Sequence, residues 1–295
     1  MTIDKQDSEA QKPLHVIACI DASKSALGVC DYAAWASRRM GDPLTLLHAL
    51  DEEKYPAKTD MTGSIGLGSR EHLQEELVNL DRERSKLALK HGHHLLDEAE
   101  KRVLAAGLEN VHKRQRHNNL ANSLVELEPE SRLFVLGLQG ESSTAVGRHI
   151  GSQLETVIRS IHRPVLLVPD EFAEPRSAML AFDGSATAFR SIELLAGTPV
   201  FKGMPMHLVM VGADTEEHRA QLKRAEQALA SQGMQVHLAI RGGDVEETLH
   251  TYQEEHDIDV LIMGAYGHSR IRQFLVGSTT AKMLETAKKP LVILR

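Results

Sequence analysis

The stretch LIMGAYGHSRIRQFLVGSTT, residues 261–280, decides the fold of this chain. It starts within an apolar run, residues 260–263, which is typical of a parallel strand buried on both faces. A glycine-rich loop follows, and after it residues 281–287 are helix-forming and contain little turn chemistry. The stretch therefore predicts a strand, a glycine-rich loop and the start of a helix, in that order.

The glycine-rich loop has the spacing Gly-x2-Gly-x9-Gly-Ser, formed by Gly264, Gly267, Gly277 and Ser278. Glycines allow a ligand to approach the main chain closely. The first turn of a helix presents unpaired N–H groups and a partial positive charge, so phosphate binds there readily. The alternative is that the glycines only form turns and that Ser278 caps the helix. The complete spacing is more specific than a pair of turn glycines.

The chain is an internal duplication. The interval from Ser152 to Pro164 equals the interval from Ser278 to Pro290. The first half carries about 35 extra residues between its second and third strands. These extra residues are expected to form an open loop followed by a long, highly charged helix.

Strands alternate with helices in both halves, and this alternation predicts parallel sheets with right-handed crossovers. The expected strands are residues 15–20, 44–50, 111–116, 132–136 and 164–168 in the first half, and residues 179–182, 206–211, 236–240, 259–263 and 290–294 in the second. The fold class is therefore α/β, with two tandem five-stranded parallel-sheet (Rossmann-like) domains and helices on both faces. We expect domains at residues 1–170 and 171–295, divided by the polar, proline-flanked segment 169–175.

The glycine spacing of the second half resembles the ATP-binding signature of the universal stress proteins, and the whole chain resembles a tandem member of that family. The resemblance implies ATP binding, with Mg²⁺ as an optional companion of the phosphates. Asp183 would lie beside the ribose and phosphates, and the backbone at Val211 would face the adenine. The nucleotide-contacting residues implied are Asp183, Val211, Gly264, Gly267, Gly277, Ser278 and Thr279.

The resemblance also implies how the two halves associate. In the family the last strands pair across a two-fold axis, so residues 165–168 and 291–294 are expected to pair. The chain would then be an intramolecular pseudo-dimer of its two domains, and a homodimer of whole chains remains open as a further level of assembly.

The first half departs from the signature. Its Gly140 and Gly151 enclose ten residues rather than nine, and Glu141 places a carboxylate where phosphate would be repelled. The corresponding candidate positions are Asp21, Gly137, Gly140, Gly151 and Ser152. We expect nucleotide mainly in the second half, with the first half binding another small molecule or serving as a pairing surface.

Composition narrows the classes of partner. Hydrophobic residues make up 42% and charged residues 25%, and the net charge of −7 argues against nucleic acid. No apolar run is long enough to span a membrane, and the polar start of the chain is not a signal peptide. Cys19 and Cys30 form no metal or redox motif, so they are expected to be core residues of a cytoplasmic protein.

Other candidate residues are assigned structural roles. Ser25 is expected to cap the first helix, and His48 and His207 lie in strands, where packing is expected rather than catalysis. Three histidines crowd one helical turn: His91, His93 and His94. His91 and His94 share a face, but no clear third metal ligand follows, so all three are expected to be exposed helix residues.

The leading functional hypothesis is a non-catalytic nucleotide-binding protein of the stress response. Two alternatives stay open: slow ATP hydrolysis or adenylate transfer, and a scaffold or lipid-type ligand carrier that uses the insertion at residues 52–89. The first alternative requires a general base or a Mg²⁺-ligand cluster near the loop, and the sequence presents neither.

Overall fold

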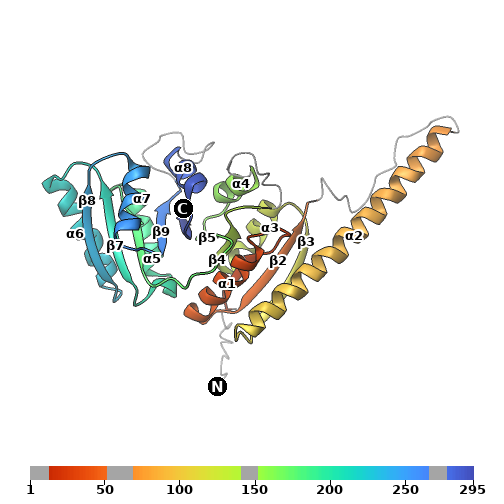
Figure 1. Ribbon diagram of the computed structural model, residues 1–295, viewed down its shortest axis with the longest axis horizontal. Coiled ribbons are helices and arrows are strands. Elements are labelled where there is room, and N and C mark those ends of the chain that lie inside the picture. Colours follow the sequence, from red (N-terminus) through yellow and green to blue (C-terminus); the bar gives the residue numbers. More distant parts are fainter. Residues whose placement is uncertain (1–12, 52–68, 141–151, 266–277) are drawn as a thin grey trace, which may run out of the picture.

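The computed structural model describes residues 13–51, 69–140, 152–265 and 278–295. Within these residues the strands form one ten-stranded sheet in the order β3-β2-β1-β4-β5-β10-β9-β6-β7-β8 (Figure 1). The chain is therefore α/β, as the sequence predicts. Residues 52–68, expected to form a loop, lie outside the described residues.

Both halves contribute elements in the same order. The first half contains β1 His15–Cys19, α1 Ala26–Met40, β2 Leu44–Leu50, α2 Ser69–Ala105, β3 Val111–His117, α3 Leu120–Leu127, η1 Glu128–Glu130, β4 Ser131–Gly137, α4 Ser152–Ser160 and β5 Val165–Val168. The second half contains β6 Ala178–Ala181, α5 Ala186–Ala196, η2 Pro199–Phe201, β7 Pro205–Val211, α6 Glu216–Ala230, β8 Gln235–Arg241, α7 Val245–Glu255, β9 Val260–Gly264, α8 Ser278–Thr286 and β10 Leu291–Leu294.

The two halves join through their last strands. β5 and β10 pair antiparallel, with Leu166 opposite Val292, whereas all the other recorded strand pairs in the sheet are parallel. Both strands are short and fully buried, so each covers an apolar edge that the other half would leave exposed. The expected pairing of the two final strands is confirmed.

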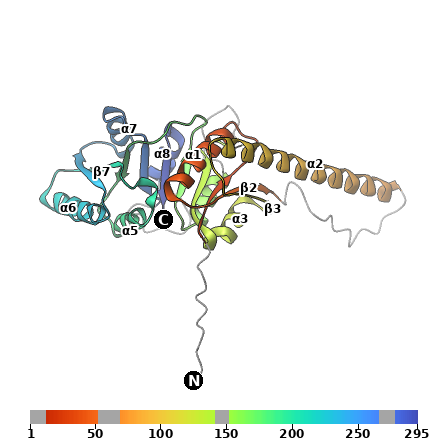
Figure 2. The same ribbon diagram turned by 90° about the horizontal axis from the view of Figure 1, so that it is seen from below.

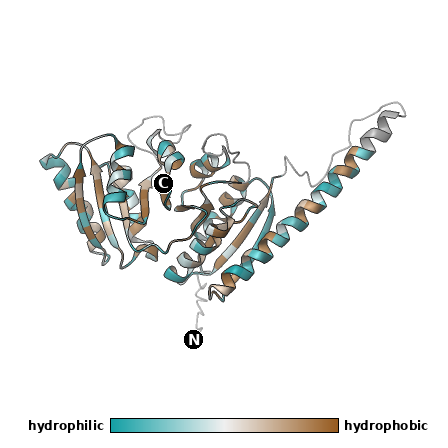
Figure 3. Cartoon of the chain, in the orientation of Figure 1, coloured by the Kyte–Doolittle hydropathy of each residue, from teal (hydrophilic) through white to brown (hydrophobic). Residues whose placement is uncertain are grey.

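Helices cover both faces of the sheet (Figure 2). One apolar layer joins α1, α2, α5 and α6 to the sheet, and a second joins α3, α4, α7 and α8. Because both faces are covered, the central strands are apolar along most of their length, and Figure 3 shows this as hydrophobic colouring along the sheet. In the described part of the chain, no helix is both long and apolar enough to cross a membrane.

The insertion in the first half becomes α2, a helix of 37 residues. Its C-terminal part packs on the sheet through Leu96, Ala99 and Val103, which are buried. Its N-terminal part extends away from the body of the molecule (Figure 1). The expected long, charged helix between the second and third strands is therefore confirmed.

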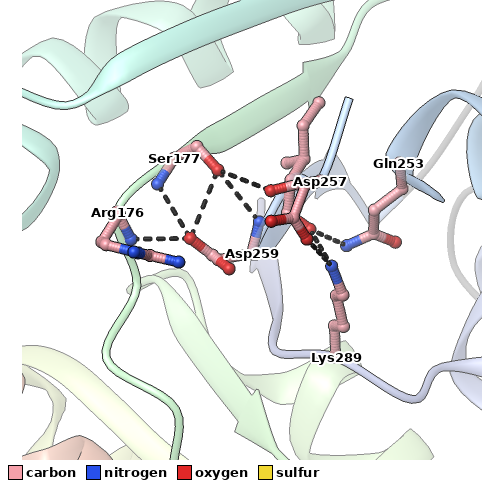
Figure 4. Close-up of polar contacts among 7 residues, drawn as sticks. Arg176, Ser177, Gln253, Asp257, Asp259 and Lys289 are labelled. Carbon is pink, nitrogen blue, oxygen red and sulfur yellow. Dashed lines mark hydrogen bonds and ion pairs between the residues drawn. The ribbon is translucent and has the colours of Figure 1, made fainter. Parts of the chain in front are cut away.

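The connection between the halves is held at the start of β6 (Figure 4). The Asp259 carboxylate accepts hydrogen bonds from the backbone N–H groups of Arg176 and Ser177, at 2.8 and 3.2 Å. Lys289 Nζ donates to the carbonyl of Ile258 at 2.8 Å. These contacts tie the incoming chain to the amino ends of β9 and β10.

Candidate functional site

The carboxyl ends of three neighbouring strands bring the predicted residues of the second half together. Strand β6 lies between β7 and β9 in the sheet, with Ala181 opposite Val209 and Leu180 opposite Ile262. Continuing each register by two residues places Asp183 opposite Val211 and Phe182 opposite Gly264, so Asp183, Val211 and Gly264 lie within one residue of the same level. Strand order reverses between β6 and β9, and ligands of open parallel sheets bind at such a reversal.

Asp183 shapes the turn that follows β6. Its Oδ1 accepts a hydrogen bond from the Ser185 N–H at 3.0 Å. The Ser185 hydroxyl in turn accepts from the Ala188 N–H at 3.1 Å and so caps α5. Ser185 therefore supplies the cap of α5, and the Asp183 side chain is exposed.

Gly184 and Gln221 are residues whose importance the sequence analysis missed. Gly184 has a φ of 72°, a left-handed conformation that favours glycine. A β-carbon at this position would also overlap the side-chain oxygen of Gln221 from α6. The spacing around Asp183 gives the signal for a turn glycine, but nothing in the sequence indicates that α6 reaches this turn.

The end of β9 is joined to the start of α8 by Thr280. Its hydroxyl is buried and contacts the carbonyl oxygens of Gly264 and Ala265, at 3.4 and 3.3 Å. The Thr280 hydroxyl is therefore turned toward the main chain. Thr279, one residue earlier, is half-buried. The contact holds the first turn of α8, which begins at Ser278, against the carboxyl end of β9.

Room remains beside Gly264. A β-carbon at this glycine would have Ser191 Oγ as its nearest neighbour, at 3.7 Å, which is an ordinary contact distance. A β-carbon would therefore fit at this point without overlapping an atom of the described residues. Gly267 and Gly277 lie outside the described residues, as does the rest of the loop.

The first half repeats the aspartate turn. Asp21 Oδ1 accepts from the backbone N–H of Ser23 at 3.0 Å and from its hydroxyl at 2.5 Å. Gly140 lies close by, since a β-carbon there would be 3.7 Å from Asp21 Oδ2. Ser152 begins α4, and Gly151 lies outside the described residues.

Gly137, unlike Gly264, has no free space. A β-carbon on Gly137 would lie 2.6 Å from the β-carbon of Ser25 and 3.0 Å from the carbonyl oxygen of Gln139. Ser25 stands at the N-cap position of α1, but its hydroxyl donates to Asp170 Oδ1 at 2.5 Å and makes no capping hydrogen bond. The expectation that the Ser25 side chain caps the helix is therefore wrong.

The linker after β5 is responsible for this difference. It runs along α1, where a β-carbon on Gly28 would overlap the carbonyl oxygen of Pro169, and the Ala173 N–H donates to the Tyr32 hydroxyl at 3.2 Å. Through Ser25, Asp170 adds a carboxylate next to Gly137, so the crevice of the first half is both narrower and more acidic.

An open groove of about 440 Å³ lies where the linker meets the second half. Its lining includes Asp170, Asp259 and Lys289. The carboxylates of Asp170 and Asp259 are already engaged by Ser25 and Ser177, and Lys289 by the Ile258 carbonyl. The contacts of Asp170 and Asp259 hold the linker and the start of β6 in place.

The remaining histidines and the cysteines have structural surroundings. His48 Nδ1 contacts the carbonyl of Ile20 at 2.7 Å, and His207 Nδ1 contacts the Tyr252 hydroxyl at 2.9 Å. Burial raises the pKa of Cys30 to about 12 and also raises the pKa of Cys19, so both thiols stay protonated and unreactive.

The histidines of α2 and the acidic residues bear on metal binding. The histidines of α2 expected to be exposed are indeed exposed: His91, His93 and His94. Among the residues that the structure describes, no group of three or more His, Cys, Asp or Glu side chains is placed to hold a metal ion.

Comparison with known proteins agrees with the duplicated architecture. The model of the universal stress protein family matches residues 14–169 and again residues 179–295. Universal stress protein Slr1230 of Synechocystis sp. is 33% identical over 285 residues, covering 95% of this chain and 99% of the relative. Universal stress protein Rv2623 of Mycobacterium tuberculosis is 24% identical, covering 98% of each chain.

Among solved structures, a universal stress protein from Archaeoglobus fulgidus has a TM-score of 0.67 at 17% sequence identity, covering 95% of this chain and 96% of its own. That likeness supports the same fold over both halves. The family model matches the chain twice in succession, and one relative is more than 30% identical across nearly the full length. The two five-stranded halves agree with these matches. The chain therefore belongs to the universal stress protein family and carries two of its domains.

Proposed function

We propose that this tandem universal stress protein binds ATP in its C-terminal domain, residues 171–295, and acts in the stress response without catalysing a reaction. The observation that carries the proposal is the convergence of Asp183, Val211 and Gly264 at the reversal of strand order. The start of α8 lies beside them and is fixed by Thr280.

Each part of this arrangement suits one part of the nucleotide. The first turn of α8 offers backbone N–H groups and a partial positive charge to the phosphates. The open side of Gly264 allows close approach to the main chain. The exposed Asp183 carboxylate is placed to accept hydrogen bonds from ribose hydroxyls. The matching family signature, Gly264, Gly267, Gly277 and Ser278, binds ATP in the family members that carry it. Mg²⁺, when present, would neutralise phosphate charge.

The N-terminal domain, residues 1–170, is proposed to leave nucleotide unbound. Gly137 is packed against Ser25, whose hydroxyl is engaged by Asp170, and Asp21 stands nearby. The Asp170 carboxylate is present in addition to the turn aspartate, and a second carboxylate close to the crevice repels a phosphate tail. We propose that this domain contributes mainly the pairing surface of β5, and that the protein works in the cytoplasm.

A matched pair of glycine variants tests the proposal. Replacing Gly277 with valine should weaken ATP binding roughly 100-fold, because it disturbs two or three charge-assisted hydrogen bonds from the loop and helix start. Replacing Gly151 with valine is the same change in the other domain and should leave affinity unaltered. Isothermal titration calorimetry of both variants and the parent chain measures this. Equal affinity for all three would reject the assignment.

Turnover separates this proposal from the enzymatic alternative. We expect a stoichiometric amount of bound ATP to survive prolonged incubation with Mg²⁺, because a slow ATPase needs a positioned base or metal-ligand cluster. Chromatographic analysis of the nucleotide after incubation measures the outcome. Production of ADP or AMP that is lost in the Gly277→Val variant would establish the enzymatic alternative instead. A chain that binds no nucleotide at all would favour the scaffold or carrier alternative.

A further inference from the structure

The projecting part of α2 carries exposed leucines that no described residue covers. Leu77, Leu80 and Leu87 are 56%, 63% and 66% exposed. They lie in the part of the helix that extends beyond the body of the molecule (Figures 1 and 2), where Figure 3 shows hydrophobic colouring among hydrophilic positions. Three large apolar side chains on a free helix present a contiguous apolar surface to water, and such surfaces mark contact sites.

These leucines share one face of the helix. Leu77 and Leu80 are three residues apart, and Leu87 follows Leu80 by seven, which are the spacings of the a and d positions of a heptad. The remaining seam position is Arg84. The stripe lies roughly 110° around the helix from Ser85 and Gly92, which are buried. The stripe is therefore a coiled-coil seam on a flank of the helix that these buried positions do not occupy.

We propose that this leucine stripe is an interface between two copies of the chain, formed as an antiparallel two-helix coiled coil. Charge along the described part of the stripe selects the second copy as the occupant. Residues 76–83 carry three acids, Glu76, Asp81 and Glu83, and one base, Arg82, whereas residues 84–90 carry three bases and no acid: Arg84, Lys86 and Lys90. Antiparallel packing sets the acidic part of each helix against the basic part of the other.

The register of the seam supports the same orientation. With Leu77 opposite Leu87 of the second copy, Arg84 lies beside Leu80, where its aliphatic stem packs on the leucine. Glu76 then stands near Lys90 of the second copy. A parallel arrangement would stack Arg84 on Arg84 in the seam and bring Glu76 toward Asp81, and both contacts are repulsive. The interface is isologous, so two copies form a closed pair.

The expected strength follows from the small area. Six leucines bury roughly 600 Å² in total, which is below the roughly 1,200 Å² of stable specific interfaces and typical of weak, transient ones. Association should therefore depend on protein concentration. It does not depend on ATP, so the proposal stands or fails independently of the nucleotide site.

Sedimentation equilibrium of the full chain over a range of concentrations tests the surface. We expect a reversible monomer–dimer equilibrium that weakens at least tenfold in the double variant Leu80→Gln, Leu87→Gln. Leu104→Gln is the matched control, because Leu104 is exposed on the same helix but lies off the seam and outside the projecting part. A parent chain that stays monomeric at about 1 mM, or a double variant that associates as the parent does, overturns the proposal.

A charge exchange tests the orientation with no change in the leucines. Glu76→Lys should weaken association, and adding Lys90→Glu in the same chain should restore it, because the pair across the interface is rebuilt with its signs reversed. If the helices pair parallel, Glu76→Lys should instead strengthen association by removing the clash with Asp81. That result, or failure of the second change to restore association, contradicts the antiparallel interface. Circular dichroism confirms that α2 persists in each variant.

Discussion

The two halves of this molecule repeat the same elements, yet they treat the crevice beside the aspartate turn differently. Asp21 and Asp183 make the same hydrogen bond to the residue two positions later. In the first half the helix that follows is covered by the linker, whereas in the second half the corresponding helix is not. The comparison shows that a connection outside the repeated unit can close one copy of a site while leaving the other available.

One pair of positions shows where this difference is encoded. Seven residues after Asp21 stands Gly28, whose missing side chain leaves space for the carbonyls of Pro169 and Asp170. Seven residues after Asp183 stands Arg190, which is exposed. A glycine is needed only where a second segment of backbone passes directly over the helix, so this position distinguishes the covered copy from the open one.

The largest effect is expected from Gly28→Ala. Its β-carbon would overlap the Pro169 carbonyl oxygen and lie 2.9 Å from that of Asp170, both of which are backbone atoms. We expect a loss of about 3 kcal/mol in the free energy of unfolding, at the upper end of overpacking costs, unless the linker moves away. Urea denaturation measures the loss. Arg190→Ala is the control and should change stability by less than about 0.5 kcal/mol.

The second prediction compares the glycines that end β4 and β9. Gly137→Ala should cost about 2 kcal/mol of stability, because its β-carbon would lie 2.6 Å from that of Ser25. Gly264→Ala has its nearest contact at 3.7 Å and should fold nearly as well as the parent, while binding ATP more weakly. Urea denaturation of the two variants measures their stability, and calorimetry measures their affinity for ATP. Equal destabilisation would show that the two crevices are equally filled.

The smallest effect concerns pH and the imidazoles of the second half. Burial lowers the pKa of His207, and the neighbouring rings of His237 and His256 lower it further. The unfolded chain therefore binds this proton more readily, so stability falls as pH drops below the ordinary histidine pKa of about 6.5. The register of the sheet places Thr45 at the position in the first half that corresponds to His207, and its hydroxyl contacts His15 Nδ1 at 2.9 Å.

Replacing His207 with threonine, the residue found in the first half, should reduce the loss of stability between pH 7.5 and 5.5. Urea denaturation at these two pH values measures the loss of stability. His250→Thr serves as the control, because His250 contacts the Thr286 hydroxyl in an exposed position. An unchanged pH dependence in His207→Thr would place the acid sensitivity elsewhere.

The sequence predicted the fold well because its signals are local. Apolar runs, turn glycines and equal intervals such as Ser152 to Pro164 determine the order of strands and reveal the duplication. The antiparallel pairing of β5 with β10 followed from family resemblance, and Leu166 opposite Val292 confirms it.

The details of the two crevices could not be predicted in the same way. The hydrogen bond between Ser25 and Asp170 joins residues 145 positions apart, and no local spacing encodes it. The approach of Gln221 to Gly184 depends on how α6 packs, and Thr280 turns inward because two backbone carbonyls lie within its reach. Side-chain partners across the fold decide these features, and periodicity gives no information about them.

The stoichiometry of ATP bound per chain tests the central claim most directly. Titration calorimetry of the full chain, with protein concentration determined independently, should give one nucleotide per chain, and Asp183→Ala should weaken that binding while Asp21→Ala leaves it unchanged. Two nucleotides per chain, or one that is lost with Asp21→Ala and retained with Asp183→Ala, would contradict the account.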